Sequence, residues 1–114
     1  MKVARKEKAR RDDWFDAGEI ATVLMLTVSG TGGSQYLLWS KSEASIGFFA
    51  ARDFEIIDDA LPADWTANLD VNGNVVLCPP EWAAPRFWDD YHEGKFAAVE
   101  AFARWREILE DSAR

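Results

Sequence analysis

The hydrophobic pattern of this chain changes period once, and that change restricts the fold more than any other feature. Between residues 19 and 78, short runs rich in β-branched and aromatic residues alternate with turn-forming residues, which is typical of strands. From Lys95 to Asp111, apolar residues recur at the spacing of one helix face, at roughly 100° per residue. The pattern therefore predicts an α+β domain in which a C-terminal helix packs against a sheet.

The strand region contains two strong hairpin signals. The sequence SGTGGS, at residues 29–34, separates two apolar runs that should pair in antiparallel fashion. Asn72 and Gly73 separate two further runs, and Asn-Gly is the strongest short hairpin signal. We expect five or so short antiparallel strands, as a meander or a partly open barrel. They are drawn from Glu19–Val28, Gln35–Ser40, Ile46–Ala50, Asp53–Ile57, Trp65–Val71 and Asn74–Cys78.

The C-terminal third predicts two helices. A short helix is expected over Pro85–Tyr91, ended by Gly94, because glycine favours the left-handed conformation that follows a helix. The longer helix, Lys95–Asp111, should close the open side of the sheet with its apolar stripe. That stripe consists of Ala98, Val99, Phe102, Trp105 and Leu109.

The net charge of −7 hides an asymmetry. Residues 1–11 carry six basic groups against Glu7, a net of +5, and the rest of the chain carries seven basic and nineteen acidic groups, a net of −12. We interpret residues 1–13 as a basic tail or frayed helix and residues 14–114 as one α+β domain. An acidic body repels nucleic acid and anionic membranes and attracts basic proteins. No apolar run approaches the roughly 20 residues of a membrane span, so we expect a cytoplasmic protein.

The residues that could carry chemistry favour structural roles. His92 is the only histidine, and it lies next to Asp89, Asp90 and Glu93, whereas a metal site usually needs several converging ligands. Cys78 ends an apolar strand directly before two prolines, which favours a buried small residue over a nucleophile. We therefore predict no enzyme, no cofactor and no metal site. An enzyme centred on His92 or on the paired carboxylates is the weaker alternative.

The segment Pro79–Gly94 combines three prolines with tryptophans and four acids. Prolines fix the backbone around the aromatic residues, so this segment predicts a docking surface. Tryptophan is a frequent interface anchor. The predicted partner-binding residues are Asp58, Asp59, Asp64, Trp88, Asp89, Asp90 and Glu93.

Two groups of motifs carry a family resemblance. The order WFDAG, GFF, ARDFEIID and LPADW, between residues 14 and 65, resembles small bacterial SH3-like domains. The later PPEW and FWDDYHEGKFAAVEAF is similar to the end of short acidic bacterial proteins, some of which are immunity proteins to polymorphic toxins. The resemblance implies a binding protein that neutralises a basic toxin. The alternatives are an SH3-like adaptor that binds a peptide and a homodimer formed through the aromatic segment.

Overall fold

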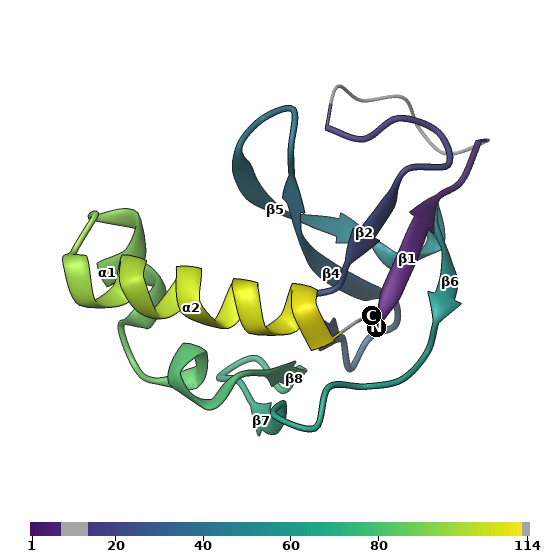
Figure 1. Ribbon diagram of the computed structural model, residues 1–114. Helices are drawn as coiled ribbons and strands as arrows, with labels where there is room; N and C mark the ends of the chain where they lie inside the picture. The colour runs from purple at the N-terminus through teal and green to yellow at the C-terminus, as the bar shows by residue number, and fades with distance from the viewer. Residues whose placement is uncertain (8–13, 113–114) are drawn as a thin grey trace.

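The computed structural model describes residues 1–7 and 14–112, and within these residues it has an α+β fold (Figure 1). This confirms the predicted fold class. The strands are β1 Lys2–Arg5, β2 Ile20–Thr22, β3 Met25–Val28, β4 Ser34–Ser40, β5 Ser45–Ala50, β6 Phe54–Asp58, β7 Thr66–Leu69 and β8 Val75–Cys78. The helices are α1 Phe87–His92 and α2 Phe96–Ser112, with short 3₁₀ turns η1 Ala51–Asp53 and η2 Pro80–Ala83.

The strands form two open antiparallel sheets. One has the order β5-β4-β3-β8-β7, and the other has the order β2-β1-β6. The described residues thus hold eight strands rather than five or so, and the two open sheets agree with the partly open barrel that was predicted. The hairpins expected at SGTGGS and at Asn72-Gly73 are both present, as β3–β4 and β7–β8.

The beginning of the chain corrects the prediction of a basic tail or frayed helix. Residues 2–5 form β1, the central strand of the three-stranded sheet. Val3 is fully buried between Ala21 of β2 and Ile56 of β6, and the Arg5 guanidinium lies 5.1 Å from the ring centroid of Phe54. The alternation of half-buried and buried residues in KVAR has the period of a strand, and the basic charge obscured it. The remainder of that predicted tail, residues 8–13, lies outside the described residues.

The predicted strand Glu19–Val28 is two strands in two different sheets. Val23 and Leu24 separate β2 from β3, and both are fully buried. Val23 belongs to the core beneath the three-stranded sheet, whereas Leu24 belongs to the core beneath α2. The long apolar run therefore marks the point where the chain passes between two cores, rather than a single strand.

α2 packs lengthwise against the five-stranded sheet (Figure 1). Ala98, Phe102 and Leu109 are buried as predicted, but Val99 is 41% exposed and Ala101 is buried in its place. The correction arises because the helix presents positions 98, 101, 102 and 109 to the sheet, which leaves position 99 beyond the edge of that stripe. Glu100 and Arg104, at i,i+4 spacing on α2, form an ion pair at 3.3 Å.

Candidate functional site

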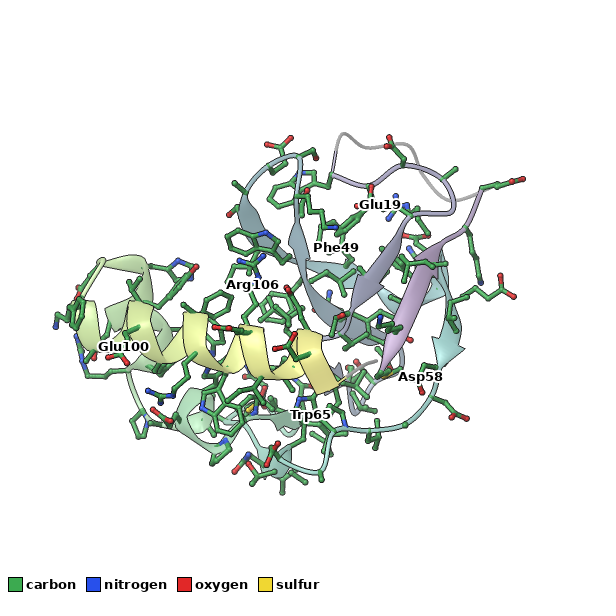
Figure 2. The ribbon with its side chains drawn as sticks, viewed as in Figure 1. Glu19, Phe49, Asp58, Trp65, Glu100 and Arg106 are labelled. Atoms are coloured by element: carbon green, nitrogen blue, oxygen red, sulfur yellow. The ribbon has the colours of Figure 1, made fainter. Side chains whose placement is uncertain are left out.

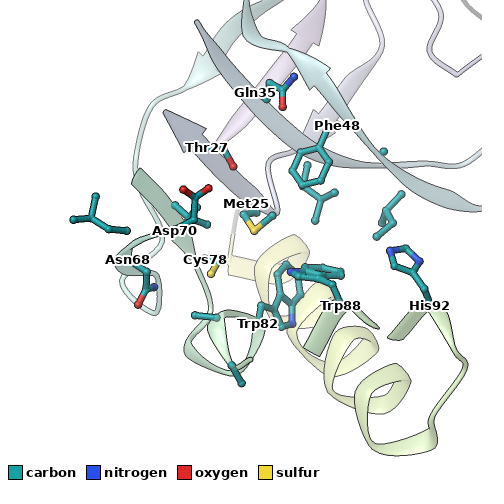
Figure 3. A pocket seen from close by; sticks show the side chains of 17 residues that line it. Met25, Thr27, Gln35, Phe48, Asn68, Asp70, Cys78, Trp82, Trp88 and His92 are labelled. Atoms are coloured by element: carbon teal, nitrogen blue, oxygen red, sulfur yellow. The ribbon is translucent and has the colours of Figure 1, made fainter. Parts of the chain in front are cut away.

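A groove of about 600 Å³ lies on the part of the five-stranded sheet that α2 leaves uncovered (Figure 3). The sheet forms its floor, and α1 and η2 form one side. The helix covers the neighbouring part of the same sheet face, where Trp39 packs 6.3 Å from Phe102 and lies beneath the Arg106 guanidinium. The residues that line the groove include Met25, Thr27, Gln35, Leu37, Phe48, Asn68, Asp70, Val76, Cys78, Trp82, Trp88 and His92.

Strand register arranges the floor in two rows. Phe48, Leu37 and Met25 lie directly opposite one another on β5, β4 and β3 and form an apolar row. One step along the strands, a second row crosses from β4 to β7. Its members are Gln35, Thr27, Val76 and Asn68. The floor is therefore apolar near the helices and more polar toward the strand ends.

Stacked aromatic rings build the helical side of the groove. Trp82, from η2, is 2% exposed and stacks on Phe102 of α2 with ring centroids 5.1 Å apart. Trp88, from α1, is half-buried and meets Trp82 edge to face at 5.5 Å. Phe48 lines the groove from β5 and is 53% exposed (Figure 3). Phe48 and Trp88 thus offer aromatic surface to the groove from the sheet and from the helix.

The second row, which we call the polar row, includes side chains whose hydrogen-bonding groups are available to a ligand. Within the described part of the chain, the Thr27 hydroxyl and the Gln35 amide make no hydrogen bond to another residue. The Asn68 amide donates to the Thr66 carbonyl oxygen at 3.3 Å and to its Oγ1 at 3.2 Å. Thr27 and Gln35 can therefore pair with a ligand without breaking a protein contact.

A carboxylate lies at the strand-end edge of the groove. Asp70 Oδ1 accepts hydrogen bonds from the backbone N–H groups of Asn74, at 2.9 Å, and Asn72, at 2.8 Å. The Asn74 side chain donates to Oδ2 at 3.0 Å. These bonds, the Asn74 backbone bond above all, lower the pKa of Asp70. The groove therefore has a fixed negative charge at this edge.

The predicted partner-binding residues fall into two groups. Asp58, Asp59 and Asp64 lie at or after the end of β6, whereas Trp88, Asp89, Asp90 and Glu93 lie on or next to α1. Figure 1 shows β6 and α1 at opposite ends of a molecule whose longest dimension is 37 Å, and Figure 2 shows Asp58 far from Glu100, near the start of α2. The second group lies on or next to the helix that forms one side of the groove, with Trp88 in its lining, whereas no residue of the first group lines the groove.

Three of the four residues in the α1 group take part in ion pairs or ring contacts. The Lys95 ammonium lies 3.2 Å from Asp90 Oδ1 and 3.4 Å from Glu93 Oε2. These carboxylates raise the pKa of Lys95, with the Asp90 hydrogen bond contributing most. Asp89 is exposed. Trp88 packs against Phe87, Tyr91 and Phe102 as well as Trp82, so it serves the core and the groove at once.

The groove residues Phe48, Gln35, Thr27 and Asp70 were not among the predicted site residues. The only signal in the sequence was the presence of polar Thr27 and Gln35 in otherwise apolar strands. Their meaning depends on register, because residues from separate strands become neighbours only once the sheet is paired.

Cys78 and His92 both line the groove, but the cysteine is poorly suited to catalysis. Cys78 is fully buried, as the sequence predicted, and burial raises the pKa of its thiol to about 11. A nucleophilic cysteine needs a lowered pKa so that thiolate is present at neutral pH. His92 is exposed at the end of α1. In residues 1–7 and 14–112, no three His, Cys, Asp or Glu side chains come together in a way that could hold a metal ion.

Neither helix in the described residues has the length and apolar character that crossing a membrane requires. Comparisons of this chain with protein-family models, with curated proteins and with solved structures gave no match.

Proposed function

We propose that this protein is a small cytoplasmic binding protein that neutralises a basic toxin by forming a stoichiometric complex with it. The observation that supports this proposal is an apolar, aromatic groove that lies between strands β3 to β5 and the acidic part of the chain, residues 58–112. Two properties, the charge of that part of the chain and the apolar anchors of the groove, suit a basic protein partner.

Residues 58–112 hold twelve acidic and four basic residues, a net charge of −8. Three of the four bases are engaged by acids of the same region: Lys95 by Asp90 and Glu93, Arg104 by Glu81 and Glu100, and Arg106 by Glu110. A negative field of this kind raises the rate at which a positively charged protein is captured, in a salt-dependent manner.

Apolar contacts would then hold the complex. Interfaces depend on a few aromatic anchors that are screened from water in the complex. Phe48 and Trp88 expose aromatic surface on two sides of an apolar floor. The charge therefore favours encounter, and the groove favours slow dissociation.

The test is co-expression with the product of the neighbouring gene, followed by growth measurement and by size-exclusion chromatography of the purified mixture. We expect growth to be restored and a one-to-one complex to form. Toxicity that this protein does not relieve, together with no complex, contradicts the proposal.

Charge-reversal variants locate the surface that steers the partner. Asp89→Lys, on α1, should slow association measured by stopped flow, whereas the matched control Asp59→Lys, at the β6 end, should change it much less. An effect confined to Asp59→Lys would place the interface at the other end of the molecule.

A second candidate is an adaptor of the SH3-like type that binds a peptide without neutralising a toxin. The concave shape of the groove and its free polar groups favour this candidate, because extended peptides dock in aromatic-lined grooves. An adaptor should bind a short peptide with full affinity, whereas a toxin inhibitor needs a folded partner.

A further inference from the structure

We propose that the groove binds an extended segment of the partner that places one aromatic or large aliphatic side chain between Phe48 and Trp88 and a lysine or arginine beside Asp70. This inference rests on the proposed function in one respect, namely that the ligand is part of a protein. It adds the chemistry of the bound segment and the direction in which that segment lies.

The apolar row on the floor of the groove determines where the large side chain of the bound segment lies. Phe48, Leu37 and Met25 form a continuous apolar row across three strands, and Trp82 and Trp88 close the helical side. A groove of about 600 Å³ has the size of a small-ligand pocket, which is ample for one aromatic side chain and the backbone beside it. Burial of such a side chain against Phe48 and Trp88 is the main source of affinity.

The polar row suits a peptide backbone. Thr27 and Gln35 lie opposite each other on adjacent strands, and within the described residues neither side chain has a protein hydrogen-bond partner. A glutamine amide offers both a donor and an acceptor, and a threonine hydroxyl offers both as well. Together they can pair with the N–H and C=O of one residue of an extended chain. A purely hydrocarbon ligand would leave both side chains without a hydrogen-bond partner.

The negative charge of Asp70 favours a basic residue at the other end of the bound segment. Asp70 is held in its ionised form by the backbone and side chain of Asn74 and the backbone of Asn72. Same-face residues are separated by about 6.6 Å along a strand, so Asp70 lies two such steps, about 13 Å, along the strands from the apolar row, and β7 lies three to four strands, about 14 to 19 Å, across the sheet from β4 and β5. The two offsets combine to about 19 to 23 Å. Because an extended chain advances about 3.3 Å per residue and a lysine or arginine side chain reaches roughly 6 Å, the basic residue should lie about four to six positions from the apolar anchor.

The experiment is selection of a phage-displayed library of random dodecapeptides on the immobilised full chain. The enriched peptide is then synthesised and titrated by isothermal calorimetry. We expect enriched sequences that combine one aromatic or large aliphatic residue with a lysine or arginine about four to six positions away. Failure to enrich a shared pattern, or enrichment of acidic sequences, overturns the inference.

Variants test each part of the groove separately. Phe48→Ala should weaken binding of the selected peptide by about tenfold or more, and Gln35→Ala should weaken it less. Asp70→Asn should cost about two- to fivefold and reduce the salt dependence of binding. Ile57→Ala is the matched control, because Ile57 is similarly exposed but lies on β6, away from the groove. Thermal unfolding of each variant separates loss of binding from loss of fold.

The two proposals can fail independently. If selected peptides bind in the groove but no toxin is neutralised, the proposed function is wrong and the groove assignment stands. If a toxin is neutralised equally well by Phe48→Ala and Gln35→Ala, the groove assignment is wrong and the proposed function stands.

Discussion

The indole Nε1 of Trp105 donates a 3.0 Å hydrogen bond to Oε1 of Glu81. The same carboxylate oxygen accepts a 2.6 Å bond from Arg104 Nη2. These contacts join α2 to η2, the turn that carries Trp82 into the groove wall. Glu81 therefore links the helix to the aromatic side of the groove through two neighbouring residues of one helix.

Glu81→Gln should lower the free energy of unfolding by about 0.5 to 1 kcal/mol at neutral pH. The loss is small because Glu81 and Arg104 are each about half exposed, at 48% and 47%, so water screens the pair. The hydrogen bonds from Trp105 and then Arg104 lower the pKa of Glu81 below its usual 4.5. A lowered pKa contributes stability above the unfolded-state pKa, and this contribution is lost as the pH falls through the folded-state pKa.

Urea unfolding at pH 7 and at about pH 3 measures this effect. The difference between wild type and Glu81→Gln should be present at pH 7 and should shrink at the lower pH. Glu100→Gln is the control, because Glu100 contacts Arg104 at 3.3 Å but has no bond to Trp105. Equal losses in both variants would show that the Trp105 contact contributes nothing.

Val3→Ala should destabilise the protein by about 2 kcal/mol, because it removes two methyl groups from a fully buried position in a central strand. Urea unfolding measures the change, and Lys2→Ala, at a half-buried neighbour, should cost well under 1 kcal/mol. Identical stability of Val3→Ala and wild type would mean that the N-terminal strand adds nothing to the fold.

Local signals in the sequence predicted most of the fold. The hairpins at residues 29–34 and at Asn72-Gly73, and the helix that begins near Lys95, each depend on residues close together in the chain. The N-terminal strand was missed because four residues are too short for a clear period and because Lys2 and Arg5 suggested a solvated tail. Arg5 is nevertheless 5% exposed and lies over the Phe54 ring, a contact that only tertiary structure supplies.

The candidate site was less predictable than the fold. Trp88 was identified from its aromatic and acidic neighbourhood, and it does line the groove. The floor could not be found, because Gln35, Thr27 and Val76 come from three strands separated by up to 49 positions in the chain and become neighbours only through register. Acidic residues that look alike in sequence, such as Asp58 of β6 and Asp89 of α1, belong to elements at opposite ends of the structure (Figure 1).

Ala44→Gly should stabilise the protein by roughly 0.5 kcal/mol. Ala44 has a φ of 50° in the turn between β4 and β5, a left-handed conformation that costs an L-residue about 1 to 2 kcal/mol. The flexibility of glycine in the unfolded chain offsets part of the gain, by about 0.5 to 1 kcal/mol.

Gly94→Ala is the converse change and should destabilise by about 1 kcal/mol. Gly94 has a φ of 75°, and an added Cβ would meet no atom within 4 Å, so the cost is one of backbone conformation alone. Thermal unfolding of the two variants should give shifts of opposite sign. If both variants shifted the unfolding temperature in the same direction, the positive φ angles of Ala44 and Gly94 would not explain the changes in stability.

The Cys78 thiol should resist alkylation by iodoacetamide in the folded protein at pH 8. Burial raises the pKa of Cys78 to about 11, so the thiolate fraction falls on the order of 10² below that of an unfolded cysteine with a pKa near 8.5. Full burial adds a steric barrier to this difference. Because Cys78 is the only cysteine, mass spectrometry of the intact chain reports its modification directly.

The same shift gives a pH dependence of stability with a defined sign. Below the unfolded-state pKa, the thiol is protonated in both states and does not change the stability. As the pH rises from about 8.5 toward 11, the thiol ionises only in the unfolded chain, so the free energy of unfolding falls. Cys78→Ala should remove this alkaline loss while costing packing at all pH values. If the folded protein were alkylated as fast as the urea-unfolded chain, the Cys78 thiol would be open to solvent. That result would contradict the burial of Cys78 at the end of β8.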